Sequence, residues 1–305
     1  MDFAWSEEQQ QHWSAVVEFA RGELNRDVIE RDGSSSFSRD AWKSCGDFGI
    51  QGLPIPTEFG GTAADPVTIM VIMEGLGYAC EDNGLIFSLN AQMWSCEMPI
   101  LTFGTQEQKM KYLPGLCDGS LIAAHGMTEP GSGSDAFSLA TTAQEKADGY
   151  ILNGSKAFVT NAPEADVFVV FATTDHEKGF AGLCAFLVDR DAAGLIVGRP
   201  LSKMGLRTSP MAEVFLEDCF VRKDQMLGTV GAGMAMFNSS MEWERSCILA
   251  SAVGTMQRQL DRAIAYARDR KQFGRPISDF QAVSHKIVEM KLSLETSRLL
   301  LYKLG

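Results

Sequence analysis

The stretch SSMEWERSCILASAVGTMQRQLDRAIAYARDRKQFG, residues 239–274, decides how the rest of the chain is interpreted. Its apolar residues recur at steps of three and four, which predicts one long amphipathic helix. The predicted apolar face consists of Leu249, Val253, Met256, Leu260 and Ile264. The polar residues expected to lie mostly outside that face are Arg258, Asp261, Arg262 and Asp269.

Near the start of this helix stands a candidate for acid–base chemistry, Glu244. It follows Trp243 and precedes an apolar run, so we expect its carboxylate to be partly desolvated. Desolvation makes a carboxylate a better proton acceptor. The alternative is a solvated or ion-paired helix residue, and Glu242, on a different face, is the internal control.

Length and composition place the chain among globular proteins. Its 305 residues are enough for two or three structural units with a core. A hydrophobic content of 45% and a charged content of 22% argue against disorder and against a coiled coil. The net charge of −12 opposes unspecific binding to nucleic acid or anionic lipid. The sequence has neither a long apolar segment nor a signal peptide, so we expect a cytoplasmic protein without membrane insertion.

The cysteines and histidines give no sign of a metal site. The odd number of cysteines and the absence of a CxxC motif predict buried free thiols rather than disulfides or zinc ligands. These cysteines are Cys45, Cys80, Cys96, Cys117, Cys184, Cys219 and Cys247. The histidines are scattered and receive no catalytic role. His125 is expected to be a packed strand residue, the alternative being an approach to a bound ring.

The N-terminal part, residues 1–118, has a helical pattern. Helix starts are predicted at Ser6, at Ser38 or Arg39, and at Asp65. Residues 85–98 are apolar on most sides, which predicts a buried helix, with Pro99 and Gly104 marking its end.

The middle part, residues 119–227, consists of short segments rich in β-branched and aromatic residues, which predicts an antiparallel β domain. Asn153 and Gly154 separate two alternating runs and predict a hairpin turn. The last part, residues 228–305, contains the long helix and a second helix after Pro276. Because the chain ends inside a helical pattern, we expect an incomplete helical bundle that belongs to a longer protein or is covered by a partner chain. The predicted fold class is α+β.

Three short motifs can carry chemistry. TEPGSGSD, residues 128–135, is a glycine-rich turn that offers backbone N–H groups and hydroxyls to a phosphate or a heterocyclic ring, or is an ordinary β-turn. KAFVTN, residues 156–161, places Phe158 and Thr160 on one face of a strand, which suits a flat ring or a half-buried strand. RDRKQFGRP, residues 268–276, gathers cations at a helix C-terminus, where they complement the helix dipole or hold a diphosphate.

The order and spacing of these motifs, together with KMGLRTSP, EVFLEDC and RDRKQFG, resemble the acyl-CoA dehydrogenase family of flavoenzymes over essentially the whole chain. SSMEWERSC and RKQFGRPISDFQAVSHKIVEMKL are similar to members that oxidise groups tethered to a carrier protein, such as prolyl-carrier-protein dehydrogenase. The resemblance implies an N-terminal helical domain (1–118), a middle β-barrel-like domain (119–227) and the start of a C-terminal helical bundle (228–305).

The resemblance also implies a cofactor, FAD, and residues that contact it. Met127, Thr128 and Ser134 would line the flavin ring and its approach, while Phe158 and Thr160 would cover its other side. The residues implied to hold the diphosphate and adenine half of a neighbouring subunit's FAD are Arg270, Gln272, Phe273 and Gln281. A homodimer or homotetramer follows from that implication.

The implied reaction is α,β-dehydrogenation of an acyl or aminoacyl thioester. By the resemblance, WER supplies Glu244 as the base for the α-proton, Arg245 helps to hold the carboxylate or the substrate, and flavin N5 accepts the hydride. The thioester would belong to an acyl or peptidyl carrier protein or to CoA, and electron-transfer flavoprotein would be the acceptor. The alternatives are a short or branched acyl-CoA dehydrogenase, an oxygen-using flavin oxidase or monooxygenase, and a non-catalytic subunit.

Overall fold

The computed structural model describes residues 5–305, and its contacts divide the chain into two compact units. Unit 1 consists of Met1–Arg26, Asp65–Ile86 and Arg245–Gly305, and unit 2 of Asp27–Ala64 and Phe87–Glu244. The division into three domains that the sequence suggests stays a prediction. Helices and strands occur in the described residues as an α+β fold, in line with the predicted class.

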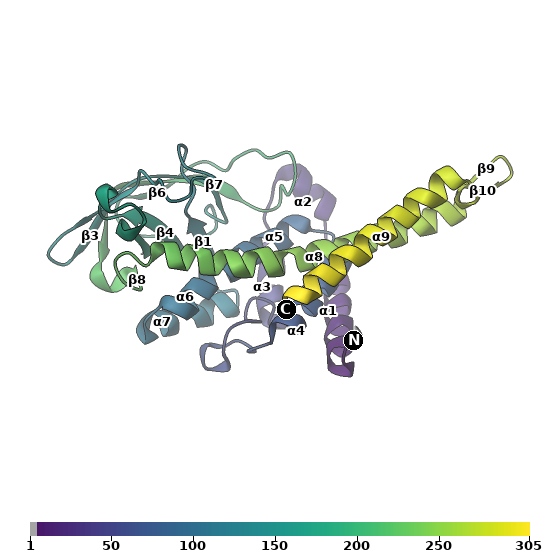
Figure 1. Cartoon of the computed structure of the whole chain (residues 1–305), viewed down its shortest axis with the longest axis horizontal. Helices are drawn as coiled ribbons and strands as arrows, with labels where there is room; N and C mark the ends of the chain where they lie inside the picture. Colours follow the sequence, from purple (N-terminus) through teal and green to yellow (C-terminus); the bar gives the residue numbers. More distant parts are fainter. Residues whose placement is uncertain (1–4) are drawn as a thin grey trace. The chain divides into compact units, whose positions relative to one another are not determined.

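Unit 1 is built from helices. They are α1 (Glu7–Glu23), α4 (Pro66–Ala79), α9 (Gln281–Leu304) and the later part of α8 (Gly233–Asp269). Between α8 and α9 the chain forms a small hairpin of β9 (Lys271–Gln272) and β10 (Arg275–Pro276), followed by the 3-10 turn η5 (Ile277–Asp279) (Figure 1). Within residues 5–305, no helix combines the length and the apolar character needed to cross a membrane.

The three helix starts predicted in the N-terminal part are confirmed. The Ser6 side chain accepts a hydrogen bond from the backbone N–H of Gln9, and the Gln9 side chain accepts one from the backbone N–H of Ser6. Together the two bonds form a capping box for α1. Ser38 caps α3 (Arg39–Phe48), and Asp65 caps α4, whose first residue is a proline.

Within unit 1, α4 and α8 approach each other so closely that their backbones touch. A Cβ atom added to Gly77 would lie 1.9 Å from the carbonyl oxygen of Ser251, and one added to Gly254 would lie 1.9 Å from that of Glu74. The glycines are therefore needed for this close approach. Buried Glu74 also ties α9 to α4, because it accepts from Arg298 Nη2 at 2.8 Å and from the hydroxyl of Tyr302 at 2.8 Å.

The long helix is present, but two residues lie on the other face from the one predicted. Leu249 is 52% exposed, whereas Arg258 is buried. The guanidinium of Arg258 donates to the carbonyl oxygens of Tyr78 and Cys80 at the end of α4. The reason is that the last carbonyls of a helix lack partners and attract a cation, which outweighs the cost of burying the arginine. Val253 and Leu260 are buried as predicted.

Unit 2 contains an eight-stranded sheet with the order β6-β7-β3-β2-β4-β5-β8, and β1 pairs with β4 off this path. Its strands are β1 (Ala123–Gly126), β2 (Thr142–Glu145), β3 (Gly149–Thr160), β4 (Val167–Thr173), β5 (Leu183–Asp189), β6 (Leu195–Val197), β7 (Met211–Arg222) and β8 (Met226–Leu227). Most pairs are antiparallel, but β1 and β2 pair with β4 in parallel. The predicted antiparallel β domain therefore holds for most strand pairs, and the two parallel pairs at β4 arise because the chain passes through other strands before β4 returns beside β1 and β2.

The predicted hairpin turn at Asn153 and Gly154 was wrong. Both residues lie inside β3, which continues to Thr160 with a register shift between Leu152 and Gly154. A Cβ on Gly154 would lie 2.4 Å from Thr141 Oγ1, so the glycine serves a close approach rather than a turn. The Asn153 side chain binds Asp218 on the neighbouring strand β7, donating to Oδ1 at 3.0 Å.

The buried helix predicted over residues 85–98 continues past Pro99. It consists of α5 (Asn83–Gln92), one π-helical segment η2 (Met93–Glu97) and α6 (Met98–Phe103). Pro99 stands in the first turn of α6, where a missing N–H costs little, so it does not end the helix, whereas Gly104 does. We call Met93–Glu97 the π turn.

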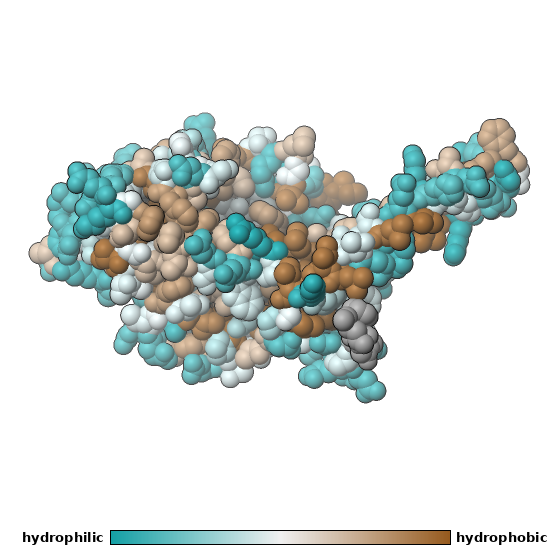
Figure 2. Space-filling model, in the orientation of Figure 1, coloured by the Kyte–Doolittle hydropathy of each residue, from teal (hydrophilic) through white to brown (hydrophobic). Residues whose placement is uncertain are grey.

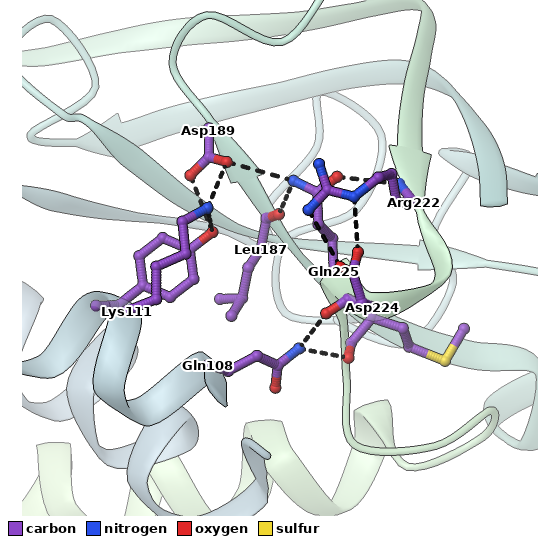
Figure 3. Close-up of polar contacts among 9 residues, drawn as sticks. Gln108, Lys111, Leu187, Asp189, Arg222, Asp224 and Gln225 are labelled. Carbon is purple, nitrogen blue, oxygen red and sulfur yellow. Dashed lines mark hydrogen bonds and ion pairs between the residues drawn. The ribbon is translucent and has the colours of Figure 1, made fainter. Parts of the chain in front are cut away.

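Helix α7 (Gln106–Cys117) is attached to the sheet by a polar network in unit 2 (Figure 3). Lys111 Nζ and the hydroxyl of Tyr112 each donate to a carboxylate oxygen of Asp189 at 2.9 Å. Gln108 Nε2 donates to the backbone oxygens of Asp224 and Met226 at 2.8 and 2.9 Å. Helix α7 is thus held in place on the end of β5 and on the turn before β8.

Candidate active site

The predicted base, Glu244, is half-buried and lies in α8 next to the π turn of unit 2. The hydroxyl of Ser95 donates a hydrogen bond to Glu244 Oε1 at 2.8 Å. Beside this contact, Trp94 stacks on Trp243, with ring centroids 5.9 Å apart and planes 8° from parallel. Two consecutive residues of the π turn therefore contact two consecutive residues of α8, which fixes where the carboxylate lies.

The π turn also carries a second carboxyl group, Glu97, which is fully buried. Gln92 Nε2 donates to Glu97 Oε1 at 2.8 Å, while Glu97 Oε2 has no hydrogen-bond partner in the described part of the chain. Burial raises the pKa of Glu97 to about 8, against the opposing effect of Gln92. Glu97 is therefore a neutral, protonated acid at pH 7. Burial also raises the pKa of the Cys96 thiol, with further contributions from Glu97 and Glu244.

The motifs 128–135 and 156–161 meet through a buried ion pair. Lys156 Nζ lies 2.6 Å from Glu129 Oε1, and both side chains are almost completely buried. Lys156 Nζ also donates to the backbone oxygen of Met127 at 3.3 Å, and the N–H of Ala157 donates to that of Thr128 at 2.8 Å. The glycine-rich turn is thus fastened to strand β3.

Both members of this pair are ionised at pH 7. Burial lowers the pKa of Lys156 to about 8, although Glu129 opposes the shift. Burial acts to raise the pKa of Glu129, but Lys156 and the N–H groups of Ala140 and Thr141 outweigh it and lower the pKa. The N–H donors lie at 2.6 and 3.0 Å, so the carboxylate has partners on both oxygens.

The residues expected to line a flavin have different environments within unit 2. Phe158 is 65% exposed with a positive φ of 54°, at a register shift of β3 between Lys156 and Val159, and Thr160 is partly exposed. Ser134 is exposed, whereas the Met127 side chain is buried and offers the site only its backbone. Their flavin-binding roles stay predictions.

An FAD fits the features of unit 2. The turn 128–135 leaves free space around Gly131 and Gly133, where an added Cβ would meet nothing within 4 Å. A backbone that is open in this way can approach a ring or a phosphate closely. The exposed Phe158 ring, held out of the strand by its left-handed backbone, offers a flat apolar surface beside it.

The glycine-rich turn and the π turn share one hydrophobic core. Cys96 and Met127 belong to the same cluster of buried residues, together with Met236 of α8. Phe137 packs edge-on against Phe237 with centroids 5.8 Å apart. His125 is a packed strand residue, as expected, with its ring against Phe171 and Phe237.

His125 is neutral at pH 7. Its Nε2 atom is buried and has no hydrogen-bond partner among residues 5–305, although the residue as a whole is only half-buried. Burial, and then the charge of Lys156, lower the pKa of His125 to about 4. All seven cysteines are buried thiols that form no disulfide, as predicted.

The other predicted residues belong to unit 1. Arg245 is exposed at the point where α8 enters this unit, and Arg270, Gln272 and Gln281 are exposed around the β9–β10 hairpin. Phe273 is 93% exposed at the tip of that hairpin, with a positive φ of 52°, and its ring contacts Phe280. The hairpin thus presents two of the four residues predicted to hold a neighbouring subunit's cofactor, Gln272 and Phe273, and Arg270 directly precedes it.

Sequence reasoning missed Ser95, Glu97, Glu129 and Lys156. Two of them carried a detectable signal, because Glu129 and Lys156 stand inside the two motifs and have opposite charges next to predicted strands. Ser95 and Glu97 carried none, since a π turn has no sequence pattern that separates it from an α-helix.

Comparisons with known proteins agree with this site. Residues 6–120, 124–219 and 231–305 match the N-terminal, middle and C-terminal domains of acyl-CoA dehydrogenases. The L-prolyl-[peptidyl-carrier protein] dehydrogenase of Pseudomonas fluorescens is 43% identical over 304 residues, which cover 99% of this chain and 80% of that protein.

Two solved structures are similar as well. The prolyl acyl carrier protein oxidase AnaB has a TM-score of 0.97 and 52% identity, covering 99% of this chain and 80% of that one. PigA with FAD and proline has a TM-score of 0.97 and 40% identity, covering 99% and 79%. With all three domain types matched in order along its length, this chain belongs to the acyl-CoA dehydrogenase family.

Proposed function

We propose that this protein catalyses FAD-dependent α,β-dehydrogenation of an aminoacyl thioester, with a prolyl group on a carrier protein as the substrate. The observation that carries the proposal is Glu244 of α8, held by a hydrogen bond from Ser95. The similarity to the prolyl-carrier-protein dehydrogenase and to AnaB supports the substrate class.

In this reaction Glu244 removes the proton on the carbon next to the thioester carbonyl. A carboxylate that accepts a hydrogen bond from Ser95 is held in place to act as the base for that proton. FAD, when bound, supplies the acceptor for the hydride that leaves the β-carbon, so that a C=C bond remains between the two carbons. The stacked pair of Trp94 and Trp243 places an apolar surface beside the base.

We propose that the isoalloxazine ring is contacted by the backbone around Met127 and Thr128 and by the side chains of Ser134, Phe158 and Thr160. The Glu129–Lys156 pair holds this surface in shape. Arg270, Gln272, Phe273 and Gln281 would contact the FAD of a second subunit, with Arg245 near the substrate.

A homodimer or homotetramer is the assembly that suits these roles. Helix α9 exposes large apolar side chains, which appear brown in Figure 2. They include Val288, Leu292, Leu299, Leu300 and Leu304, each at least 50% exposed. Such a surface favours protein–protein contact.

A carrier protein and CoA present the same phosphopantetheine arm, so the attachment of the substrate is decided elsewhere on the surface. A basic patch of Arg199, Lys203 and Arg207 would suit an acidic carrier protein. Arg207 already donates to the backbone oxygen of Gly33 at 2.9 Å, and Lys203 to that of Leu206 at 2.8 Å. Arg199 is exposed and is therefore the better residue for a charge-reversal test of docking.

The test of the function uses Glu244→Gln in the FAD-loaded protein. Prolyl-loaded peptidyl carrier protein and butyryl-CoA are each mixed with the protein, and bleaching of the flavin absorbance is followed in single turnover. We expect prolyl carrier protein to reduce the native flavin, and the variant to be slower by about 1,000-fold, the contribution of a general base. Glu242→Gln is the matched control and keeps the native rate. A variant at position 244 that is as fast as the native protein would remove Glu244 from the mechanism.

A second candidate concerns the electron acceptor. The solved relative AnaB is described as an oxidase, which favours dioxygen over electron-transfer flavoprotein. Oxygen consumption that equals product formation would identify an oxidase, whereas product formation that requires electron-transfer flavoprotein would identify a dehydrogenase. Purified protein that takes up no FAD would point instead to a non-catalytic subunit.

A further inference from the structure

We infer that Ser95 is a positioning residue for Glu244, and that the π turn exists to bring its hydroxyl to the carboxylate. This inference rests on the proposed function, because it assumes that Glu244 is the base. It adds a residue that acts on the base rather than on the substrate.

The burial and geometry of Ser95 support a single partner of this kind. Ser95 is 3% exposed, so its hydroxyl has lost its contact with water and must bond within the protein. It donates to Glu244 Oε1 at 2.8 Å, the distance of a good O–H···O bond. A bond from a neutral donor to a carboxylate stabilises the ionised form, which is the form that accepts a proton.

The π turn explains how the hydroxyl reaches the carboxylate. A π turn adds one residue to a helix, so it rotates the side chains that follow relative to those before it. Here Trp94 stacks on Trp243 while Ser95 bonds Glu244, so adjacent residues of the turn contact adjacent residues of α8. Trp94 is itself held by its Nε1 donating to Asn90 Oδ1 at 2.7 Å.

Other ionisable groups surround Glu244. The π turn contributes Cys96 and Glu97, whose raised pKa values keep both neutral at pH 7, and α8 contributes Glu242 and Arg245 nearby in sequence. With Cys96 and Glu97 neutral, no negative charge in the π turn competes for the hydroxyl of Ser95. Above pH 8, Glu97 ionises and adds a like charge in the same turn.

The test compares Ser95→Ala, Ser95→Thr and Ser240→Ala in the FAD-loaded protein, with prolyl-loaded peptidyl carrier protein as the probe. Ser240 is the matched control, because it is a buried serine of α8 whose hydroxyl donates to the backbone oxygen of Phe237. Flavin bleaching gives the limiting rate across pH 5–9, and the concentration dependence gives substrate affinity.

We expect Ser95→Ala to lower the limiting rate at pH 7 by about tenfold or more, with substrate affinity changed less than threefold. The acid side of its rate profile moves to higher pH by about one unit, because the ionised base is less stabilised. Ser95→Thr keeps a hydroxyl and restores most of the rate. Ser240→Ala keeps the native rate and profile.

The inference is overturned if Ser95→Ala keeps the native rate and pH profile, or if Ser240→Ala shifts the pH profile as much as Ser95→Ala does. The proposed function survives either result as long as Glu244→Gln is slow. A fast Glu244→Gln protein overturns the function, and the inference falls with it. If Ser95→Ala does not fold, Ser95→Thr decides: a native profile supports the inference, and a profile like that of a protein without the hydroxyl overturns it.

Discussion

Two buried glutamates in unit 2 differ in charge at pH 7, because Glu129 is ionised and Glu97 is neutral. Glu129, in the glycine-rich turn, is paired with Lys156 and accepts two backbone N–H bonds, so its pKa is lowered. Glu97, in the π turn, has one amide donor and an oxygen without a partner in the described residues, and burial raises its pKa to about 8. Burial alone therefore does not set the charge of a carboxyl group, because the number and charge of its partners decide it.

The difference matches the tasks of the two regions. A charged pair with fixed partners holds the glycine-rich turn against β3, which keeps the proposed flavin surface rigid. A neutral acid in the π turn places no charge close to the proposed base. This difference can be tested by removing the partner of Glu129 and by replacing the titratable group of Glu97.

The largest effect is expected for Lys156→Met, which leaves Glu129 buried without its counter-charge. The free energy of unfolding should fall by about 3–5 kcal/mol, the cost of an unpaired buried charge. Urea unfolding followed by circular dichroism measures it. The double variant Lys156→Met with Glu129→Met should recover most of the loss, while exposed Lys146→Met should change little. A loss below about 1 kcal/mol would show that Glu129 is neutral, like Glu97.

The next effect, which depends on pH, is expected for Glu97→Gln. The folded protein holds the Glu97 proton up to about pH 8, whereas the unfolded chain releases it near pH 4.5. The native free energy of unfolding should therefore fall as pH rises through this window, and the variant should escape that part of the fall. The gain relative to the native protein should grow by on the order of 4 kcal/mol between pH 4 and pH 8.

Exposed Glu58→Gln is the control for this titration. Parallel stability curves for Glu97→Gln and the native protein between pH 5 and pH 8 would mean that Glu97 is ionised throughout. In that case the contrast between the two glutamates would disappear.

The smallest effect is expected for Lys111→Met, which removes an ion pair of the network in Figure 3. The side chains of Lys111 and Asp189 are 51% and 30% exposed, so solvent screens their attraction. The free energy of unfolding should fall by less than about 1 kcal/mol, and less still in high salt. A loss as large as that of Lys156→Met would show that burial is not what separates the two pairs.

The helix caps and the fold class could be predicted from the sequence, because both depend on residues close together in the chain. Ser6, Ser38 and Asp65 act through hydrogen bonds to N–H groups two or three residues away. The wrong predictions involve distant partners. Gly154 allows the close approach of Thr141, which directly precedes the neighbouring strand β2, and Arg258 is buried because the carbonyls at the end of α4 attract it.

The candidate site shows the same division. Glu244 and the motif residues were predicted from local patterns and the family resemblance, and their roles stay predictions. The hydroxyl of Ser95 could not be predicted, because its contact joins residues 149 positions apart and depends on a π turn. The Glu129–Lys156 pair joins two motifs that were identified separately, and they meet because the sheet places β1 beside β4, β4 beside β2 and β2 beside β3.

The two glycines where α4 meets α8 have a consequence for how this region can change. At that crossing, peptide groups of one helix touch peptide groups of the other, and no side chain lies between them. The spacing of the axes is then a property of the main chain, so substitutions around the crossing can alter surface chemistry without moving the helices apart. Even a single added methyl group at Gly77 or Gly254 would force the two helices apart, so the distance between them tolerates no larger residue at either position.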